Sequence, residues 1–288
     1  MRIELRGKSF AGRAVLGPIR LTIGRGRRVA VLGPSGIGKS TLLRIVAGLD
    51  RDFDGQAEGD DRLAVVFQEP TLLPWRRALD NITIAAGCDA AVGRDLMAQV
   101  GLAGREDQFP RQMSLGQQRR LALARAFAAR PDILLMDEPF GALDPIIRAR
   151  AQQDLRRIQQ ALGSTIMLVT HDMEEAIHLG DRIAVMDKGR LVQHGTPAQI
   201  IRQPATDFVA EMVGGVERPL RLLSLIPVSD VVENGSAEGE AVAVETSLRD
   251  ALAICLWTGR EALPVTRDGA GQQRVTLDAI RARAEGRT

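Results

Sequence analysis

The chain has 288 residues, a length that predicts one large domain and a smaller one. Its net charge of +2 is close to balance and gives no indication of nucleic acid or a polybasic membrane anchor. Two cysteines without metal-ligand spacing fit a reducing cytosol. The N-terminus is charged where a signal peptide needs an apolar stretch, and no apolar run reaches the ~18 residues of a spanning helix. Membrane association is therefore expected to come through a partner.

Short apolar runs between glycine turns predict a β-rich start, with strands at 3–5, 20–23 and 29–32. The last strand leads into a glycine-rich segment, and a helix is expected over 39–49. A strand, such a turn and a helix in this order are the setting of a phosphate-binding loop. The loop consists of Gly33, Pro34, Ser35, Gly36, Ile37, Gly38, Lys39, Ser40 and Thr41.

This loop is suited to gripping a nucleoside triphosphate. Its three glycines let the backbone turn N–H groups inward, and the helix that follows adds its positive end. Lys39 is expected to reach the outer phosphates and the Ser40 hydroxyl to bind Mg²⁺. The alternative is a glycine-rich turn that matches by chance, which is disfavoured because every fixed position of the motif is filled.

Strands and helices then alternate, which predicts a mostly parallel sheet covered on both faces. Strands are expected at 63–67, 133–136 and 165–170, and a hairpin at 183–193. Helices are expected within 81–104 and at 117–130, 144–163 and 173–179. The chain changes character at about residue 215, and beyond it strands and helices are expected in the order β-α-β-β-α over 242–283. We therefore predict domains at 1–215 and 216–288.

The strand at 133–136 ends in two adjacent carboxylates. Asp137 is placed to hold Mg²⁺, as hydrolysing phosphate-loop proteins require, and Glu138 can polarise an attacking water. The alternative is an exposed acid pair at a strand end, which the preceding apolar strand and the presence of Lys39 and Ser40 disfavour.

The segment 113–120, Met-Ser-Leu-Gly-Gln-Gln-Arg-Arg, resembles the signature motif of the ABC (ATP-binding cassette) ATPases. Other segments are similar to that family in the right order: Gln68 to its Q-loop, 142–144 to its D-loop, His171 to its switch histidine and Phe10 to its adenine-stacking aromatic. The resemblance covers about residues 1–213. It implies an α/β fold of the P-loop NTPase type, a RecA-like core with a β-subdomain and a helical subdomain.

The resemblance also implies site residues for ATP and Mg²⁺. His171 would contact the γ-phosphate and hold the attacking water, and Gln68 would join Ser40 and Asp137 at the metal. The signature would face the nucleotide of a second, head-to-tail copy. Its implied nucleotide-binding residues are Ser114, Gly116 and Gln117, and the D-loop adds Asp144. Standing alone, His171 and Phe10 would be structural. Leu115 departs from the family's glycine and is expected to point away from the nucleotide, and the short stretch 50–63 predicts a trimmed β-subdomain.

Further segments resemble importer cassettes. Residues 69–75 are similar to the nitrate, sulfonate and taurine group, and the apolar part 72–75 is expected to dock a membrane subunit, with a local core plug as the alternative. Residues 180–187, 207–209 and 222–225 resemble the glycine betaine/choline osmoprotectant group. The tail after residue 216 resembles one CBS unit, a small α+β module expected to pair across the dimer.

We therefore expect the ATP-hydrolysing subunit of a bacterial-type importer. It would lie at the cytoplasmic face of the inner membrane, bound through transmembrane permease subunits, with a second copy and a separate substrate-binding protein, and no nucleic acid. The CBS-like tail favours a quaternary-amine osmolyte such as glycine betaine or choline as cargo, whereas residues 74–75 favour nitrate, sulfonate or taurine. A soluble ABC ATPase of translation or DNA repair is disfavoured, because the chain has neither two cassettes nor a long coiled-coil insertion.

Overall fold

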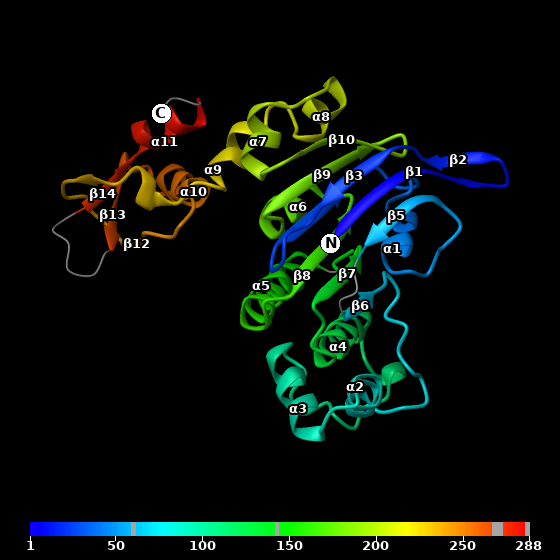
Figure 1. Ribbon diagram of the computed structural model, residues 1–288. Coiled ribbons are helices and arrows are strands. Elements are labelled where there is room, and N and C mark those ends of the chain that lie inside the picture. The colour runs from blue at the N-terminus through cyan, green and yellow to red at the C-terminus, as the bar shows by residue number, and fades with distance from the viewer. Residues whose placement is uncertain (59–61, 142–143, 267–272, 286–288) are drawn as a thin grey trace. The chain divides into compact units, whose positions relative to one another are not determined.

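The computed structural model describes residues 1–288 except 59–61, 142–143, 267–272 and 286–288 (Figure 1). The chain forms two compact units, Met1–His194 and Gly195–Thr288. Among the described residues, no helix combines the length and the hydropathy that crossing a bilayer requires.

A six-stranded sheet forms the centre of the first unit. Its strands, in spatial order, are β10 (Arg190–Gly195), β9 (Arg182–Asp187), β4 (Arg28–Leu32), β8 (Thr165–Thr170), β7 (Ile133–Asp137) and β6 (Leu63–Val66). The pairs β4–β8, β4–β9, β7–β8 and β6–β7 are parallel. Every residue of β8 is buried, as expected for a strand covered on both faces. The mostly parallel sheet is thus confirmed.

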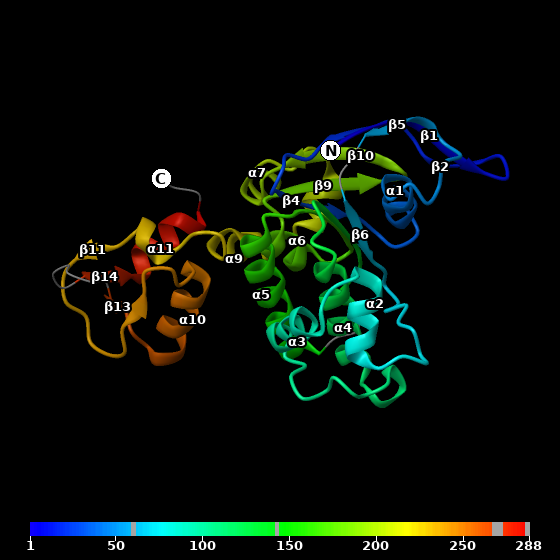
Figure 2. The ribbon, with the colours of Figure 1, turned by 60° about the horizontal axis from the view of Figure 1, so that its bottom comes forward.

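A second sheet is antiparallel and centres on β1 (Arg2–Phe10). Its other strands are β2 (Arg13–Leu16), β3 (Ile19–Thr22) and β5 (Asp54–Glu58), and each of them pairs with β1. The short stretch 50–63 therefore still supplies a strand, β5. Side chains of β1 and β3 share one core with α1 (Lys39–Val46) and the central sheet. In Figure 2, β1 and β5 lie on the same side of the central sheet as α1.

Helices α2 (Ala78–Ala86), α3 (Ala90–Gln99) and α4 (Leu115–Ala128) pack on one another and form a helical group, visible together in Figures 1 and 2. The one-turn helix η1 (Pro110–Gln112) precedes α4. Two further helices, α5 (Pro145–Leu162) and α6 (Met173–Leu179), flank β8 in the sequence. Asp144 caps the start of α5, and Gly163 ends it in the left-handed region with φ 68°.

The second unit begins with three short helices, α7 (Pro197–Arg202), α8 (Asp207–Met212) and α9 (Arg218–Leu223), and the turn η2 (Val228–Asp230). Its sheet has the order β11 (Glu233–Asn234), β14 (Gln273–Thr276), β13 (Ala262–Thr266) and β12 (Val242–Ala243). Helices α10 (Leu248–Thr258) and α11 (Leu277–Ala284) complete it. The predicted β-α-β-β-α order is observed, with its own buried core. A domain boundary at residue 215 stays a prediction.

A buried amide organises the chain just after β6. Asn81 on α2 is fully buried, and its Oδ1 accepts from the Leu73 N–H at 2.7 Å. Its Nδ2 donates to the carbonyls of Leu73, Arg76 and Arg77 at 3.1–3.2 Å. One side chain therefore fixes the loop 73–77, which presents Trp75 to solvent with 69% of its surface exposed.

Replacing Asn81 by Ala should lower the free energy of unfolding by about 2 kcal/mol, because buried backbone groups lose their partner. Urea denaturation followed by circular dichroism measures the change. The neighbouring variant Trp75→Ala is the control and should change stability by less than about 0.5 kcal/mol, since Trp75 is exposed. Equal losses in the two variants would contradict the role given to Asn81.

Candidate active site

The candidate site lies at the carboxyl edge of four adjacent parallel strands. Registers Leu32↔Thr170 and Val169↔Asp137 bring the ends of β4, β8 and β7 level, and Val66↔Met136 adds β6. The segments that follow these strands contain the phosphate loop, His171, Glu138 and Gln68 in turn. Ligands of open α/β sheets bind at this edge, so the fold brings the predicted phosphate and catalytic residues to one place.

Glycine is required in the phosphate loop for two reasons. Gly36 and Gly38 have φ of 80° and 102°, in the region that side chains disfavour. A Cβ at Gly38 would lie 2.5 Å from Leu16 Cδ2, and one at Gly33 would lie 2.6 Å from the Met186 carbonyl oxygen. Gly38 also caps α1 without a side-chain hydrogen bond, so the first N–H groups of this helix are suited to bind an anion.

Lys39 is held inside the loop. Its side chain is 4% exposed, and Nζ donates to the Gly33 and Pro34 carbonyl oxygens at 2.8 Å each. Burial lowers the pKa of this ammonium, while the carboxylates of Glu138 and Asp137 oppose the shift. Glu138 Oε1 lies 3.8 Å away. The ammonium is thus positioned where it can bind phosphate oxygens.

Two of the three residues predicted for Mg²⁺, Ser40 and Asp137, fit that ion. Ser40 Oγ donates to Asp137 Oδ1 at 3.0 Å, which places a hydroxyl and a carboxylate together. Oxygen donors of this kind are the ligands that Mg²⁺ prefers. Burial raises the pKa of Asp137, and the Ser40 hydrogen bond opposes the rise. Gln68 is exposed, and among the described residues no hydrogen bond joins it to this pair.

Glu138 and His171 meet directly. His171 Nδ1 lies 3.1 Å from Glu138 Oε1. Glu138 has a φ of 45°, a left-handed conformation that is rare for this residue type, and its N–H donates to the Val169 carbonyl at 2.9 Å. This turn after β7 directs the carboxylate toward the residue that follows β8.

The signature residues are not brought to this place in a single chain. Ser114 caps α4 with a reciprocal pair: its Oγ accepts from the Gln117 N–H at 3.3 Å, and Gln117 Oε1 accepts from the Ser114 N–H at 2.9 Å. Leu115 is exposed, and Gly116 is half-buried. In the described part of the chain, no hydrogen bond or ion pair links Ser114, Gly116 or Gln117 to the phosphate loop.

Two predicted residues lie at the ends of other elements. Asp144 Oδ1 accepts from the Ile147 N–H at 3.0 Å and so caps α5, while residues 142–143 of the predicted D-loop lie outside the described residues. Phe10 ends β1 with 49% of its surface exposed, and the Lys8 ammonium lies 4.4 Å from its ring centroid. Adenine stacking by Phe10 stays a prediction.

Sequence reasoning missed the support of the His171 turn. Asp172 caps α6, and its Oδ2 pairs with Arg148 Nη1 on α5 at 3.2 Å. Glu175, also on α6, is buried. An aspartate between a strand and a helix is an N-cap signal that the sequence offered for Asp172, whereas nothing in the local pattern predicted the burial of Glu175.

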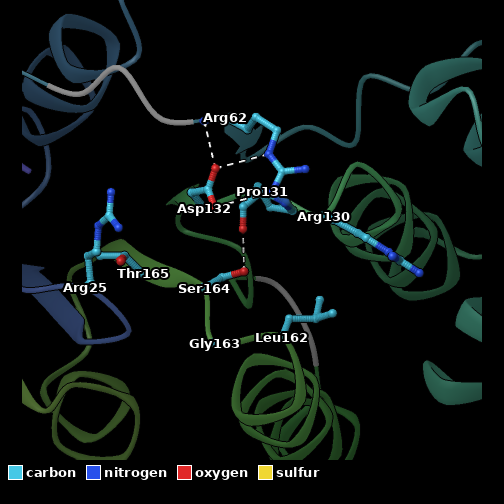
Figure 3. A pocket seen from close by; sticks show the side chains of 9 residues that line it. All are labelled: Arg25, Arg62, Arg130, Pro131, Asp132, Leu162, Gly163, Ser164 and Thr165. Atoms are coloured by element: carbon cyan, nitrogen blue, oxygen red, sulfur yellow. Dashed lines mark hydrogen bonds and ion pairs between the residues drawn. The ribbon is translucent and has the colours of Figure 1, made fainter.

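A cavity of about 370 Å³ lies at the opposite edge of the sheet, where β7 and β8 begin (Figure 3). Arg62 Nε pairs there with Asp132 Oδ2 at 3.1 Å, and the Ser164 hydroxyl donates to the Pro131 carbonyl. Leu162, the last residue of α5, lines this cavity, as do Arg25 and Arg130. None of the predicted site residues lines it.

Comparisons with known proteins agree with this geometry. The sequence profile of the ABC transporter family matches residues 16–141. The glycine betaine uptake system ATP-binding protein YehX of Escherichia coli is 39% identical over 90% of this chain and 91% of its own length. The aliphatic sulfonates import ATP-binding protein SsuB 2 of Streptomyces avermitilis is 48% identical over 80% and 92%. The trimethylamine N-oxide transport system ATP-binding protein TmoW of Ruegeria pomeroyi is 36% identical over 87% and 80%.

Among solved structures, a dimeric ATP-binding cassette, MJ0796, in a post-hydrolysis state with ADP and phosphate bound, is similar with a TM-score of 0.62 and 28% identity. The match covers 68% of this chain and 98% of that one. The fold, the phosphate loop and these relatives agree, and the chain belongs to the ABC transporter family as an importer-type ATPase.

Proposed function

We propose that this chain energises an importer for a quaternary-amine osmolyte such as glycine betaine or choline. The extent of the matches carries the proposal. The relatives named for glycine betaine and trimethylamine N-oxide match 90% and 87% of this chain, whereas the sulfonate relative matches 80%. Glycine betaine and trimethylamine N-oxide both carry a nitrogen with three methyl groups, so two cargoes of one chemical class accompany the longer matches.

Hydrolysis is assigned to residues at the carboxyl edge of the sheet. Lys39 and the N–H groups at the start of α1 would bind the phosphates of ATP, and Ser40, Asp137 and Gln68 would hold Mg²⁺, which would neutralise developing charge. Glu138 accepts the proton of the attacking water. His171, 3.1 Å from Glu138, orients that carboxylate and meets the γ-phosphate.

A second copy of the chain completes each site. Ser114 and Gly116 lie at the positive start of α4, which is suited to a γ-phosphate, and no hydrogen bond among the described residues links them to the phosphate loop of their own chain. The similar cassette that was solved as a dimer with ADP and phosphate supports pairing of two copies, and the position of the signature at the start of α4 suits a head-to-tail pair. Asp144, at the start of α5, would lie in the same interface.

The loop after Gln68 is the proposed contact with permease subunits, which would hold the chain at the cytoplasmic face of the membrane. Trp75 is exposed there, on a backbone that Asn81 fixes. Arg125 of α4 donates to the Pro70 and Thr71 carbonyls at 3.1 and 2.9 Å. The loop is therefore tied to the signature helix, so that movement of α4 reaches the docking residues. A separate substrate-binding protein would deliver the cargo.

Import of nitrate, sulfonate or taurine is the second candidate. It is favoured by the sulfonate relative, which has the higher identity, 48%. A soluble ABC ATPase outside transport gains no support from these relatives, whose names are those of import or transport systems.

The small α+β fold of the second unit supports a CBS-like module. Its β12 and β13 are parallel, β13 and β14 are antiparallel, and α10 and α11 pack on them around a core of their own. We assign to it pairing with a second copy and sensing of ionic strength or a nucleotide.

Glu138→Gln is expected to lower the rate of ATP hydrolysis at least about 100-fold, because water activation is lost while phosphate binding remains. Phosphate release measures the rate, and size exclusion with MgATP should show a stable dimer. The exposed control Glu211→Gln should keep the wild-type rate. Unchanged hydrolysis in Glu138→Gln would remove Glu138 from this role.

Cargo is tested by uptake in a host that lacks this chain and other betaine importers. Labelled glycine betaine or choline should enter when the wild-type chain is restored, but not when Glu138→Gln replaces it, since transport needs hydrolysis. Restored uptake of taurine or an alkanesulfonate without betaine or choline would favour the second candidate.

Deleting residues 216–288 should leave MgATP binding intact, since the phosphate loop lies in the first unit. The response of transport to osmolarity should be lost, because the proposed sensor is absent. Binding is measured with a fluorescent ATP analogue and uptake across a salt series. A truncated importer that responds to salt like the intact one would exclude the tail as the sensor.

A further inference from the structure

A buried carboxyl lies next to the turn that carries His171. Glu175 on α6 is 5% exposed. Its Oε2 is hydrogen bonded to the Thr170 hydroxyl. Within the described part of the chain, its Oε1 has no hydrogen-bond partner. A buried carboxylate oxygen without a donor is costly when the group is ionised, so this environment favours the neutral acid.

Glu175 is tied to both neighbours of His171. The Thr170 hydroxyl that bonds Glu175 also accepts from the Asp172 N–H at 3.0 Å. Asp172 Oδ1 in turn accepts from the N–H groups of Glu174 and Glu175, at 2.8 and 3.2 Å. Thr170 and Asp172, the residues before and after His171, are thus both hydrogen bonded to the start of α6.

Glu175 and the proposed catalytic pair also face one cavity. This cavity, of about 80 Å³, is lined by Glu138 and His171 on one part and by Arg148, Asp172 and Glu175 on another. It is polar and large enough to hold a water molecule. A change of charge on Glu175 therefore alters the electrostatic environment of Glu138 and His171, the residues proposed to act on the attacking water.

We propose that Glu175 is a positioning residue for hydrolysis, whose neutral carboxyl holds the Thr170–Asp172 turn so that His171 meets Glu138. The inference rests on the proposed role of His171. Ionisation would add a negative charge beside the turn, where Glu175 would compete with Asp172 for Arg148 and with Glu138 for His171.

The charged groups near Glu175 come from several elements around α6. Arg148 lies on α5, His171 and Asp172 in the turn, and Glu138 after β7. Glu174 is its exposed neighbour on α6, and β4 offers Arg28, which pairs with Asp181 at 2.6 Å beyond the other end of α6. Burial raises the pKa of Glu175 to about 7, Asp172 adds to the rise, and Thr170, Arg148 and His171 oppose it.

The test compares ATP hydrolysis by the full-length chain between pH 6 and 8.5. Glu175→Ala should lower kcat at least about tenfold, because His171 is displaced, with the MgATP Kd within about twofold of wild type. Glu175→Gln imitates the neutral acid, so it should keep the wild-type rate at pH 6. Wild-type kcat should fall as pH rises through about 7, and the Gln variant should lack this inflection.

Glu174→Gln, one residue away and exposed, is the matched control and should keep the wild-type profile. A wild-type inflection in Glu175→Gln would overturn the proposal, and this variant alone decides if Glu175→Ala does not fold. His171→Ala separates the two levels of inference. If it hydrolyses ATP normally, the role of His171 fails; if it is inactive while both Glu175 variants behave as wild type, only the role of Glu175 fails.

Discussion

The parallel pairing of β4, β8 and β7 is the constraint on which the site depends. Their register sets the carboxyl ends level, so that the phosphate loop, His171 and Glu138 follow neighbouring strand ends although Gly33 and His171 lie 138 residues apart in the sequence. Apolar burial on both faces holds these strands, and it leaves no freedom for a shift of register. Chemistry at this edge is therefore a consequence of packing at the centre of the sheet.

Much of this could be predicted because the decisive signals are local. Asp144 and Pro145 predict the start of α5, and Gly163 predicts its end. The spacing of its glycines likewise predicts the phosphate loop. By contrast, β2 and β5 were missed: β2 has only four residues and β5 is largely polar, and both are strands because they pair with β1. Strand pairing between distant segments has no signature in either segment alone.

The sequence predicted which residues belong to the site, but it did not predict how they are arranged. The left-handed conformation of Glu138 and the burial of Glu175 arise from the fold around them, which a linear pattern does not encode. Lys39 illustrates the same limit, since its position in the motif was clear but its hydrogen bonds to the carbonyls of its own loop were not. These contacts satisfy a buried ammonium that would otherwise be costly to desolvate.

Two arginines give the proposed dimer a physical means of coupling. Arg125 joins the signature helix α4 to the loop that presents Trp75, and Arg148 joins α5 to Asp172 beside His171. A second copy that closed on the starts of α4 and α5 would therefore act through short, charge-assisted contacts on both the proposed docking loop and the proposed catalytic turn. Closure, hydrolysis and movement of a membrane partner then share the same helices, because each helix that would meet the second copy also holds one of the two functional loops.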